Sequence, residues 1–197
     1  MAVRDSMEAL IQKIRFEIGD LEQPYVFTDQ EIQDQLDRRR RDYRYSPLQV
    51  NRVINPGGQT VQYNDFWADG GDWEADAEIV DRNYNVLIPE TVDGLLGTWT
   101  FAPGTITDPS LRISGRRYDV YGTAADLCMT WISRLKLEFS ESGTRTLPGG
   151  TSVSFSEQKV ERIRNLGRLE KEFRRRAWVV TSRFVRTDLA PQGGYSF

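Results

Sequence analysis

Hydrophobic residues change their spacing twice along this chain, from helical to strand-like and back to helical. Near the N-terminus Met7, Leu10, Ile11, Ile14 and Ile18 recur at helical spacing, and Gly19 follows where a helix would end. Past Pro47 the apolar residues alternate with polar ones, which is typical of strands with one wet face. A chain with both periods cannot be all-helical or all-β. We therefore expect an α+β fold.

The helical parts of the sequence predict a small bundle of about four helices. The first spans about residues 5–18, and the second begins at Thr28-Asp29-Gln30-Glu31, a capping box in which Thr28 and Glu31 satisfy each other's backbone N–H groups. We expect this second helix to run through Arg38–Arg41 and to end near Tyr43–Tyr45. The third and fourth helices are expected around residues 116–140 and 157–180, with Ser154 or Ser156 capping the fourth.

The middle of the chain predicts an inserted β-rich subdomain. Short alternating runs are separated by turn residues such as Pro56-Gly57-Gly58 and Asp69-Gly70-Gly71. One expected strand covers residues 61–65 and another Trp73 to Ile79, with shorter ones in 84–89, 98–102 and 111–114. The bundle is therefore assigned to residues 1–49 and 115–186, the insert to 50–114, and an extended C-terminal tail to 187–197.

The charged residues are also unevenly distributed between the expected insert and the last part of the chain. Residues 64–94 contain nine carboxylates and a single basic residue, Arg82, whereas residues 157–197 contain ten basic residues and five acidic ones. An acidic pole beside basic arms allows identical chains to pair head to tail, which generates a ring when the rotation closes. This pattern indicates an assembly component.

Residue types exclude most catalytic templates. The 197 residues contain no histidine, so neither a Ser-His-Asp nor a Cys-His relay can form, and the common zinc spacings are absent. No phosphate-binding Gly-Lys-Ser or Gly-Lys-Thr loop occurs. The group Asp65, Asp69, Asp72 and Asp76 is the one dense carboxylate cluster, interpreted as a solvated acidic face, a docking patch for a basic partner, or a metal or acid–base site. We expect no enzymatic activity and no cofactor.

Cellular context follows from two further observations. Cys128 is the only cysteine, so no disulfide can form within the chain and a reducing compartment is expected. The N-terminus lacks the apolar core of a signal peptide, and no window approaches the roughly 18 apolar residues of a membrane span. We expect a soluble protein with no membrane partner.

Arginine outnumbers lysine by 22 to 4, which favours contacts with carboxylates, rings and phosphates. For Arg38, Arg39, Arg40 and Arg41 three interpretations stay open: a solvated helix end, salt bridges to a neighbouring copy, or contact with DNA phosphates. Arg174, Arg175 and Arg176 allow the same choice. Trp178 and Phe184 are expected in the core or in a subunit contact, and the aromatic tail is expected to order on a partner.

Four features together resemble the head–tail adaptor (connector, head-completion) proteins of long-tailed bacteriophages. They are the short first helix followed by Phe27-Thr28-Asp29-Gln30-Glu31-Ile32, the paired long helices, the Ser-rich loop Thr151–Ser156 before the last helix, and the C-terminal tail. The run from Trp73 to Phe101 is similar to an insertion in longer members, although the insert here is large.

The resemblance implies a structural virion protein of the neck, assembled in the host cytoplasm. It implies a ring of 12 copies below the portal that receives the next neck or tail component on its other side. The tail would dock on the portal through Leu189, Pro191, Tyr195 and Phe197. Subunit contacts are expected at Arg174, Arg175, Arg176, Trp178, Glu74, Asp76 and Glu78, and Arg38–Arg41 would form subunit salt bridges or non-specific contacts with DNA in the channel.

Two other classes of function remain open. One is a small nucleic-acid-binding protein that uses Arg38–Tyr45, with Tyr43 and Tyr45 as stacking groups; steeply salt-dependent binding by the monomer would support it. The other is a carboxylate-dependent metal enzyme, which would need tightly bound metal that is lost on changing Asp69 and Asp72.

Overall fold

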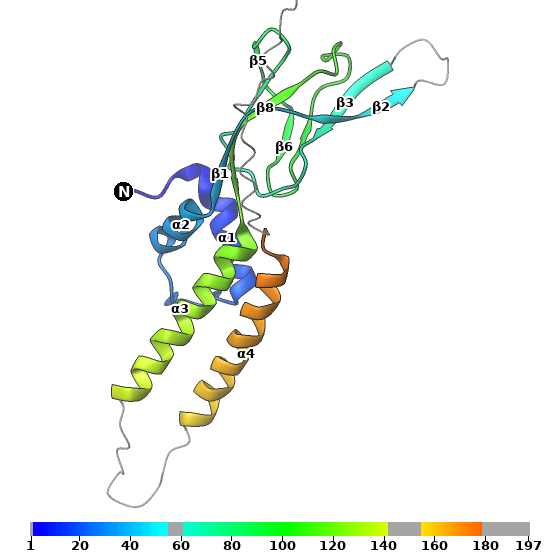
Figure 1. Cartoon of the computed structure of the whole chain (residues 1–197). Helices are drawn as coiled ribbons and strands as arrows, with labels where there is room; N and C mark the ends of the chain where they lie inside the picture. Colours follow the sequence, from blue (N-terminus) through cyan, green and yellow to red (C-terminus); the bar gives the residue numbers. More distant parts are fainter. Residues whose placement is uncertain (1, 55–60, 142–154, 179–197) are drawn as a thin grey trace, which may run out of the picture.

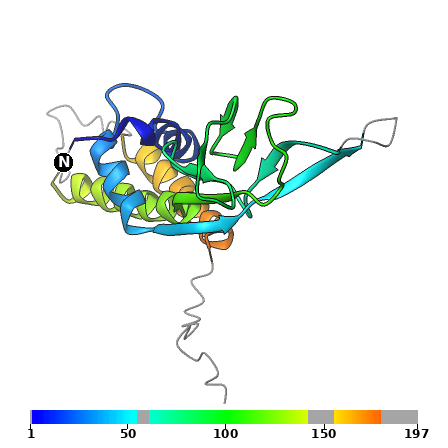
Figure 2. The ribbon, with the colours of Figure 1, turned by 90° about the horizontal axis from the view of Figure 1, so that it is seen from above.

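A bundle of helices and a β-rich unit lie end to end in the computed structural model of the chain (Figure 1), which describes residues 2–54, 61–141 and 155–178. Four α-helices and two antiparallel four-stranded sheets make up the described part, so the predicted α+β class is confirmed. The helices gather on one side of the molecule and the strands on the other (Figure 2). The predicted tail, residues 187–197, lies outside the described residues.

The N-terminal helices follow their local signals. A short 3-10 turn, η1 (Asp5–Met7), leads into α1 (Glu8–Ile18), and Gly19 ends the helix with a left-handed φ of 69°. α2 (Asp29–Arg38) begins at the predicted capping box: the Thr28 hydroxyl accepts from the Glu31 N–H, and the Glu31 side chain accepts from the Thr28 N–H. The predicted end of the first helix at Gly19 and the predicted capping box of the second are confirmed, whereas the α-helical part of the first begins at Glu8 and not at residue 5.

A buried arginine fixes the loop between α1 and α2. The Arg15 side chain is 2% exposed and its guanidinium reaches Asp20 at 2.9 Å, the Phe27 carbonyl at 2.9 Å and Asp29 at 2.6 Å. Asp20 in turn accepts from the Val26 and Phe27 N–H groups. The two terminal nitrogens of Arg15 are therefore paired with carboxylates inside the chain, while its buried Nε has no hydrogen-bond partner among the described residues.

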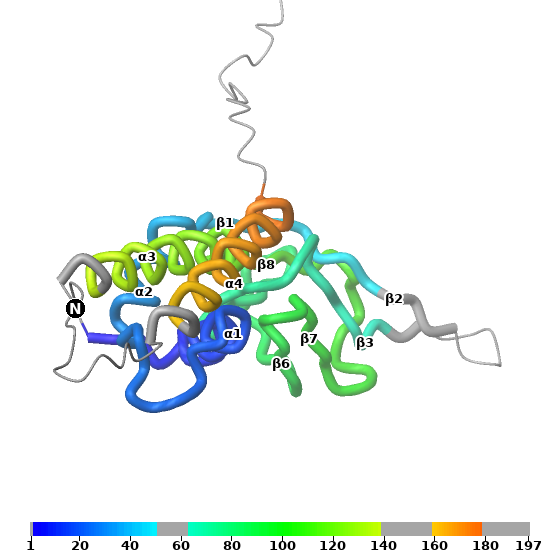
Figure 3. The backbone as a smooth tube through the Cα atoms, turned by 90° about the horizontal axis from the view of Figure 1, so that it is seen from below, coloured from blue at the N-terminus to red at the C-terminus, as the bar shows by residue number. Residues whose placement is uncertain are grey.

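Two long helices complete the bundle: α3 (Val120–Glu141) and α4 (Phe155–Arg176). α4 packs along α3, with α1 beneath them (Figure 3). The bundle core combines the apolar faces of all four helices with Phe27 and Tyr118. Its buried members include Leu10, Ile14, Ile18, Ile32, Leu36, Ala124, Cys128, Leu166 and Phe173.

The first sheet links the β-rich unit to the bundle. It has the order β1-β8-β4-β5, with β1 (Arg40–Pro47), β8 (Arg112–Tyr118), β4 (Glu78–Val80) and β5 (Val86–Leu87). β1 leaves α2 and β8 enters α3, and Arg40 lies opposite Tyr118 in the antiparallel pair. This two-stranded ribbon joins the two halves of the molecule (Figure 1).

The second sheet has the order β2-β3-β7-β6. Its strands are β2 (Gln49–Ile54), β3 (Val61–Trp67), β7 (Thr98–Thr100) and β6 (Thr91–Asp93). Between the sheets lies an aromatic core in which Phe66 packs edge-to-face on Phe101 and Trp73 on Trp99. Four of the ten buried residues of this core are aromatic, and such large rings bury much area in a unit whose strands are short.

Four expected element boundaries are wrong. α2 ends at Arg38, and residues 40–47 form β1 because they pair with β8 and place the Tyr43 ring 5.1 Å from that of Trp73. Residues 73–77 form an isolated bridge and a turn, so β4 begins only at Glu78. The third helix begins at Val120, since residues up to Tyr118 continue β8, and α4 ends at Arg176. The Ser154 and Ser156 caps lie outside the side chains that the structure describes.

Candidate functional site

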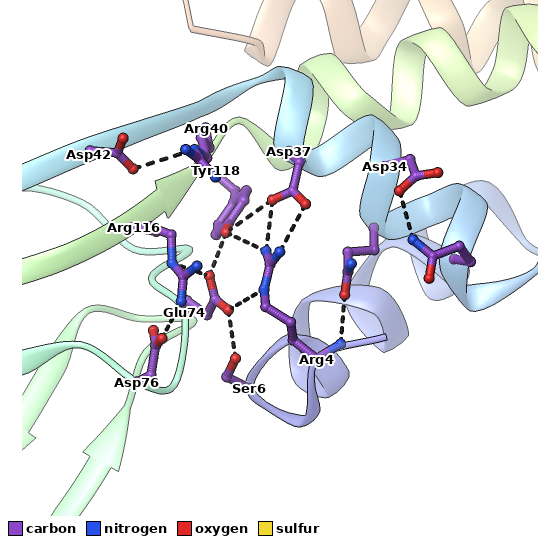
Figure 4. Close-up of polar contacts among 12 residues, drawn as sticks. Arg4, Ser6, Asp34, Asp37, Arg40, Asp42, Glu74, Asp76, Arg116 and Tyr118 are labelled. Atoms are coloured by element: carbon purple, nitrogen blue, oxygen red, sulfur yellow. Dashed lines mark hydrogen bonds and ion pairs between the residues drawn. The ribbon is translucent and has the colours of Figure 1, made fainter. Parts of the chain in front are cut away.

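Glu74 forms the polar centre of the junction between the bundle and the β-rich unit (Figure 4). Its side chain is fully buried, and its carboxylate is 2.9 Å from Arg4 Nε and 2.8 Å from Arg116 Nε. The hydroxyls of Ser6 and Tyr118 each donate to it as well. Side chains from the N-terminal segment, η1 and β8 thus meet at one carboxylate.

Arg4 bridges this centre to α2. Its two terminal nitrogens lie 2.9 and 2.7 Å from the Asp37 carboxylate, and its backbone N–H donates to Gln33 Oε1 at 2.7 Å. The Tyr118 hydroxyl accepts from Arg4 at 3.0 Å. A bidentate guanidinium–carboxylate pair of this kind fixes geometry as well as charge.

The network shifts the protonation of its members in opposite directions. Burial alone would raise the pKa of Glu74, but hydrogen bonds from Ser6, Tyr118 and Arg4 outweigh it and the pKa is lowered. The hydrogen bonds from Arg4 lower the pKa of Asp37. Burial, with the Glu74 carboxylate beside it, raises the pKa of the Tyr118 phenol. The centre is therefore ionised at neutral pH with the phenol as a donor, which suits a structural role.

Three of the four arginines between the last residue of α2 and the start of β1 have partners within the chain. Arg39 pairs with Asp126 at 2.7 Å and with Asp119 at 3.4 Å, and Arg40 lies 3.5 Å from Asp42. Arg41 stacks over the Trp178 ring at 4.7 Å. Arg38 is exposed and has no ion pair among the described residues. The four arginines and Trp178 line a shallow groove together with Asp119 and Asp126.

The triplet at the end of α4 is divided in the same way. Arg174 pairs with Glu170 and lies 3.6 Å from Asp126, while Arg176 stacks on Tyr121 at 3.8 Å. Arg175 points to solvent without an ion pair in the described part of the chain. The structure therefore assigns internal partners to two of these three predicted contact residues.

Trp178 lies where the described chain leaves the bundle. Two guanidinium groups cover its ring: Arg41 from β1 at 4.7 Å and Arg117 from β8 at 4.6 Å. Its backbone N–H is 3.3 Å from Asp119 Oδ1. Because Arg117 also donates to the carbonyls of Asp69 and Gly71, the clamp is itself held on the β-rich unit.

The three acidic residues expected to contact a neighbour lie in different surroundings. Glu74 is buried, and Asp76 pairs with Arg116. In this conformation Glu74 is not accessible to another copy, which corrects that expectation. Glu78 is exposed on β4 with no ion pair among the described residues. The residues expected to dock on a portal, Leu189, Pro191, Tyr195 and Phe197, lie outside the described residues, as does Phe184.

The carboxylate cluster of the insert does not converge. Asp72 lies 2.6 Å from Lys13 Nζ, Asp65 accepts from the Thr100 hydroxyl, and Asp69 is exposed. Within residues 2–54, 61–141 and 155–178 no group of three or more carboxylate or cysteine side chains is arranged to hold a metal ion. Over the same residues no helix is long and apolar enough to cross a membrane.

Sequence reasoning missed the residues that hold the junction together. Arg4 precedes the first predicted helix, Ser6 lies in its first turn without a motif, and Tyr118 falls within the third predicted helix, around residues 116–140. A buried glutamate within an acidic run has no signal in the local sequence, because its partners lie 42 to 70 residues away.

Comparison with known proteins adds no relative: no family model, no curated protein and no solved structure matches this chain.

Proposed function

We propose that this chain is a structural virion protein, a head–tail adaptor that forms a ring below the portal. In this role it joins the portal to the next neck or tail component, has no enzymatic activity, and resides in the virion neck after assembly in the host cytoplasm. The C-terminal tail docks on the portal, and identical chains contact one another around the ring.

The clamp on Trp178 is the observation that best supports this proposal. A tail that docks on a large partner can hold its subunit in a fixed position only if the start of the tail is fixed to the rest of the subunit. Arg41 and Arg117 hold that base on β1 and β8, at the ribbon that joins the two halves of the molecule. The bundle with its inserted β-rich unit also agrees with the architecture that the resemblance implies.

Nucleic-acid binding through Arg38–Tyr45 has less support. From Arg40 on, the stretch is the strand β1, and Arg39, Arg40 and Arg41 already have partners within the chain. Tyr45, half-exposed, packs edge-to-face on Tyr84 at 5.0 Å. A stacking platform would need these groups to exchange their internal contacts for bases.

Negative-stain electron microscopy tests the proposal directly. The full chain is mixed with the portal protein of the same virus. In a separate sample, a matched variant that lacks residues 187–197 is mixed with the same portal protein. We expect a ring that caps the portal with the full chain and is lost with the truncation. A full chain that stays folded but never decorates the portal would contradict the proposal, and steeply salt-dependent DNA binding by the monomer would then favour the alternative.

A further inference from the structure

α4 carries an unpaired basic stripe on the side that faces away from the bundle. We call Arg164, Arg168, Lys171 and Arg175 the α4 stripe. These residues follow one another in steps of four, three and four, which places them on one face of the helix, roughly opposite the buried Leu166 and Phe173.

No member of the α4 stripe has an ion pair with any described residue, although all four are exposed. Like charges three or four residues apart destabilise a helix by about 0.2–0.5 kcal/mol per pair. The stripe contains three such neighbouring pairs in succession. It extends over roughly 16 Å at 1.5 Å per residue, so an anionic surface of that length would relieve the repulsion.

A complementary surface lies on the second sheet of the same chain. Phe66 and Trp99 face the aromatic core, so the alternate residues of β3 and β7 face outward. The register places Asp65 beside Thr100 and Thr91, and Trp67 beside Thr98 and Asp93. Asp65 and Asp93 are exposed and have no ion pair among the described residues.

The spacing of the two carboxylates matches that of the stripe. Asp65 and Asp93 lie two strands apart and two residues apart along the strands, which gives about 12 Å from strand geometry. Arg164 and Lys171, or Arg168 and Arg175, are seven residues apart on α4, which is about 10.5 Å along the helix axis. A helix laid across this face can therefore pair two cations with two carboxylates at once.

We propose that the α4 stripe of one copy docks on the outer face of β3, β7 and β6 of a second copy. Arginine or lysine pairs with Asp65 and Asp93, and the threonine hydroxyls and the Trp67 ring complete the contact. The two surfaces differ, so the contact is head-to-tail and propagates from copy to copy. This inference rests on the proposed function, for which it names the subunit interface.

A second copy fits the α4 stripe better than DNA does. The exposed carboxylates Glu161 and Glu172 flank the stripe and would repel a phosphate backbone, and the whole chain has a net charge of −3. A folded partner with two carboxylates at fixed positions can avoid those flanking charges. Gly167 adds room, because a Cβ placed there meets nothing within 4 Å inside the chain.

Zero-length cross-linking detects the contact. A carbodiimide is added to a mixture of isotopically light and heavy full-length chains at low salt, with and without the portal protein, and cross-linked peptides are identified by mass spectrometry. We expect mixed light–heavy links from Lys171 to Asp65 or Asp93. Links confined to a single chain, or none from Lys171, would overturn the inference.

Charge reversal tests the same contact by function. Arg168→Glu with Lys171→Glu is expected to lower ring occupancy on the portal by about tenfold or more, since like charges then face each other. The matched control, Arg44→Glu with Lys136→Glu, makes the same change in net charge at exposed residues elsewhere. Adding Asp65→Lys and Asp93→Asn to the reversed stripe should restore occupancy, with thermal unfolding as the check on folding.

The outcomes separate the inference from the proposed function. Rings that form equally well with the reversed stripe and with the control would overturn the inference and leave the adaptor role intact. Intact rings with a stripe-dependent, steeply salt-sensitive DNA affinity would also overturn it and make DNA the partner. Wild-type chain that forms no ring contradicts the proposed function, and the cross-link between free copies then decides the inference alone.

Discussion

Arg4 reaches from the N-terminal segment to the buried carboxylate of Glu74, with its Nε 2.9 Å from Oε1. The same guanidinium holds Asp37 of α2. Because Glu74 belongs to the β-rich unit, this pair ties the start of the chain to both halves of the molecule. The angle between the bundle and the insert therefore depends on a polar contact in addition to the β1–β8 ribbon.

Replacing this carboxylate should destabilise the whole chain. Glu74→Gln leaves Arg4 and Arg116 without their shared counter-ion, and we expect a loss of about 2–3 kcal/mol in the free energy of unfolding. Both arginines keep a second carboxylate, Asp37 or Asp76, which limits the loss. Urea denaturation followed by circular dichroism measures it. Glu78→Gln, on the exposed face of β4, is the matched control and should change the value by less than about 0.5 kcal/mol.

Acid should weaken the junction through the same groups. The pKa values of Glu74 and Asp37 are lowered in the folded chain, so their stabilisation is present above the ordinary carboxyl pKa of about 4. It is lost as the pH falls below that value through the lower folded pKa values. We expect the free energy of unfolding to fall more steeply with acid in wild type than in Glu74→Gln. If the free energy of unfolding falls equally steeply with acid in both proteins, carboxylates other than Glu74 determine the acid sensitivity.

Local signals predicted the parts of the fold that local chemistry determines. The Thr28 capping box and Gly19 mark helix ends with side-chain or backbone requirements that the sequence states directly. The end of α2 was missed, because residues 40–47 become a strand only through pairing with β8, more than 60 residues later. Their arginines and tyrosines fit either structure in isolation.

In the candidate site, too, local features could be predicted from the sequence and long-range contacts could not. Clusters of arginine are visible in the sequence, but which of them are free depends on long-range partners: Arg39 finds Asp126, and Arg41 finds Trp178. The α4 stripe was hidden for a related reason. Its residues are spread over about three helical turns of a mixed-charge segment, and only the direction of the buried face separates them from Arg162, Arg174 and Arg176.

The capping box at Thr28 allows the contribution of one local contact to stability to be tested. Thr28→Ala removes the acceptor for the Glu31 N–H, and we expect a loss of about 1 kcal/mol in the free energy of unfolding. Thr28→Ser keeps the hydroxyl and should stay within about 0.5 kcal/mol of wild type. Denaturant titrations of both variants check this. An equal loss in both would mean that the Thr28 methyl, and not the hydroxyl, supplies the stability.

Asp72 combines a left-handed backbone with a mostly buried carboxyl group. Its φ is 66°, and burial raises its pKa although Lys13 lies 2.6 Å away. The ionised form is thus disfavoured by folding. Asp72→Asn keeps an acceptor for Lys13 and tolerates the left-handed conformation, so at neutral pH its free energy of unfolding should equal or exceed that of wild type.

Asp72→Ala is the contrasting variant at the same position. It removes the acceptor and places a residue poorly suited to positive φ, so we expect a loss of about 1 kcal/mol or more. Thermal and urea unfolding of the two variants at pH 7 make the comparison. Equal destabilisation by Asn and Ala would show that the charge on Asp72 outweighs its burial.

Removing the Trp178 clamp should loosen the exit of the chain without unfolding the bundle. Trp178→Ala loses the stacking of Arg41 and Arg117, and we expect about 1–2 kcal/mol less stability together with faster tryptic cleavage at Arg174–Arg176. Trp178→Phe keeps a ring, so its stability and its cleavage rate should lie between those of wild type and Trp178→Ala. If the proposed tail docking is right, ring occupancy on the portal declines in the same order. Unchanged cleavage rates would mean that Trp178 does not anchor the base of the tail.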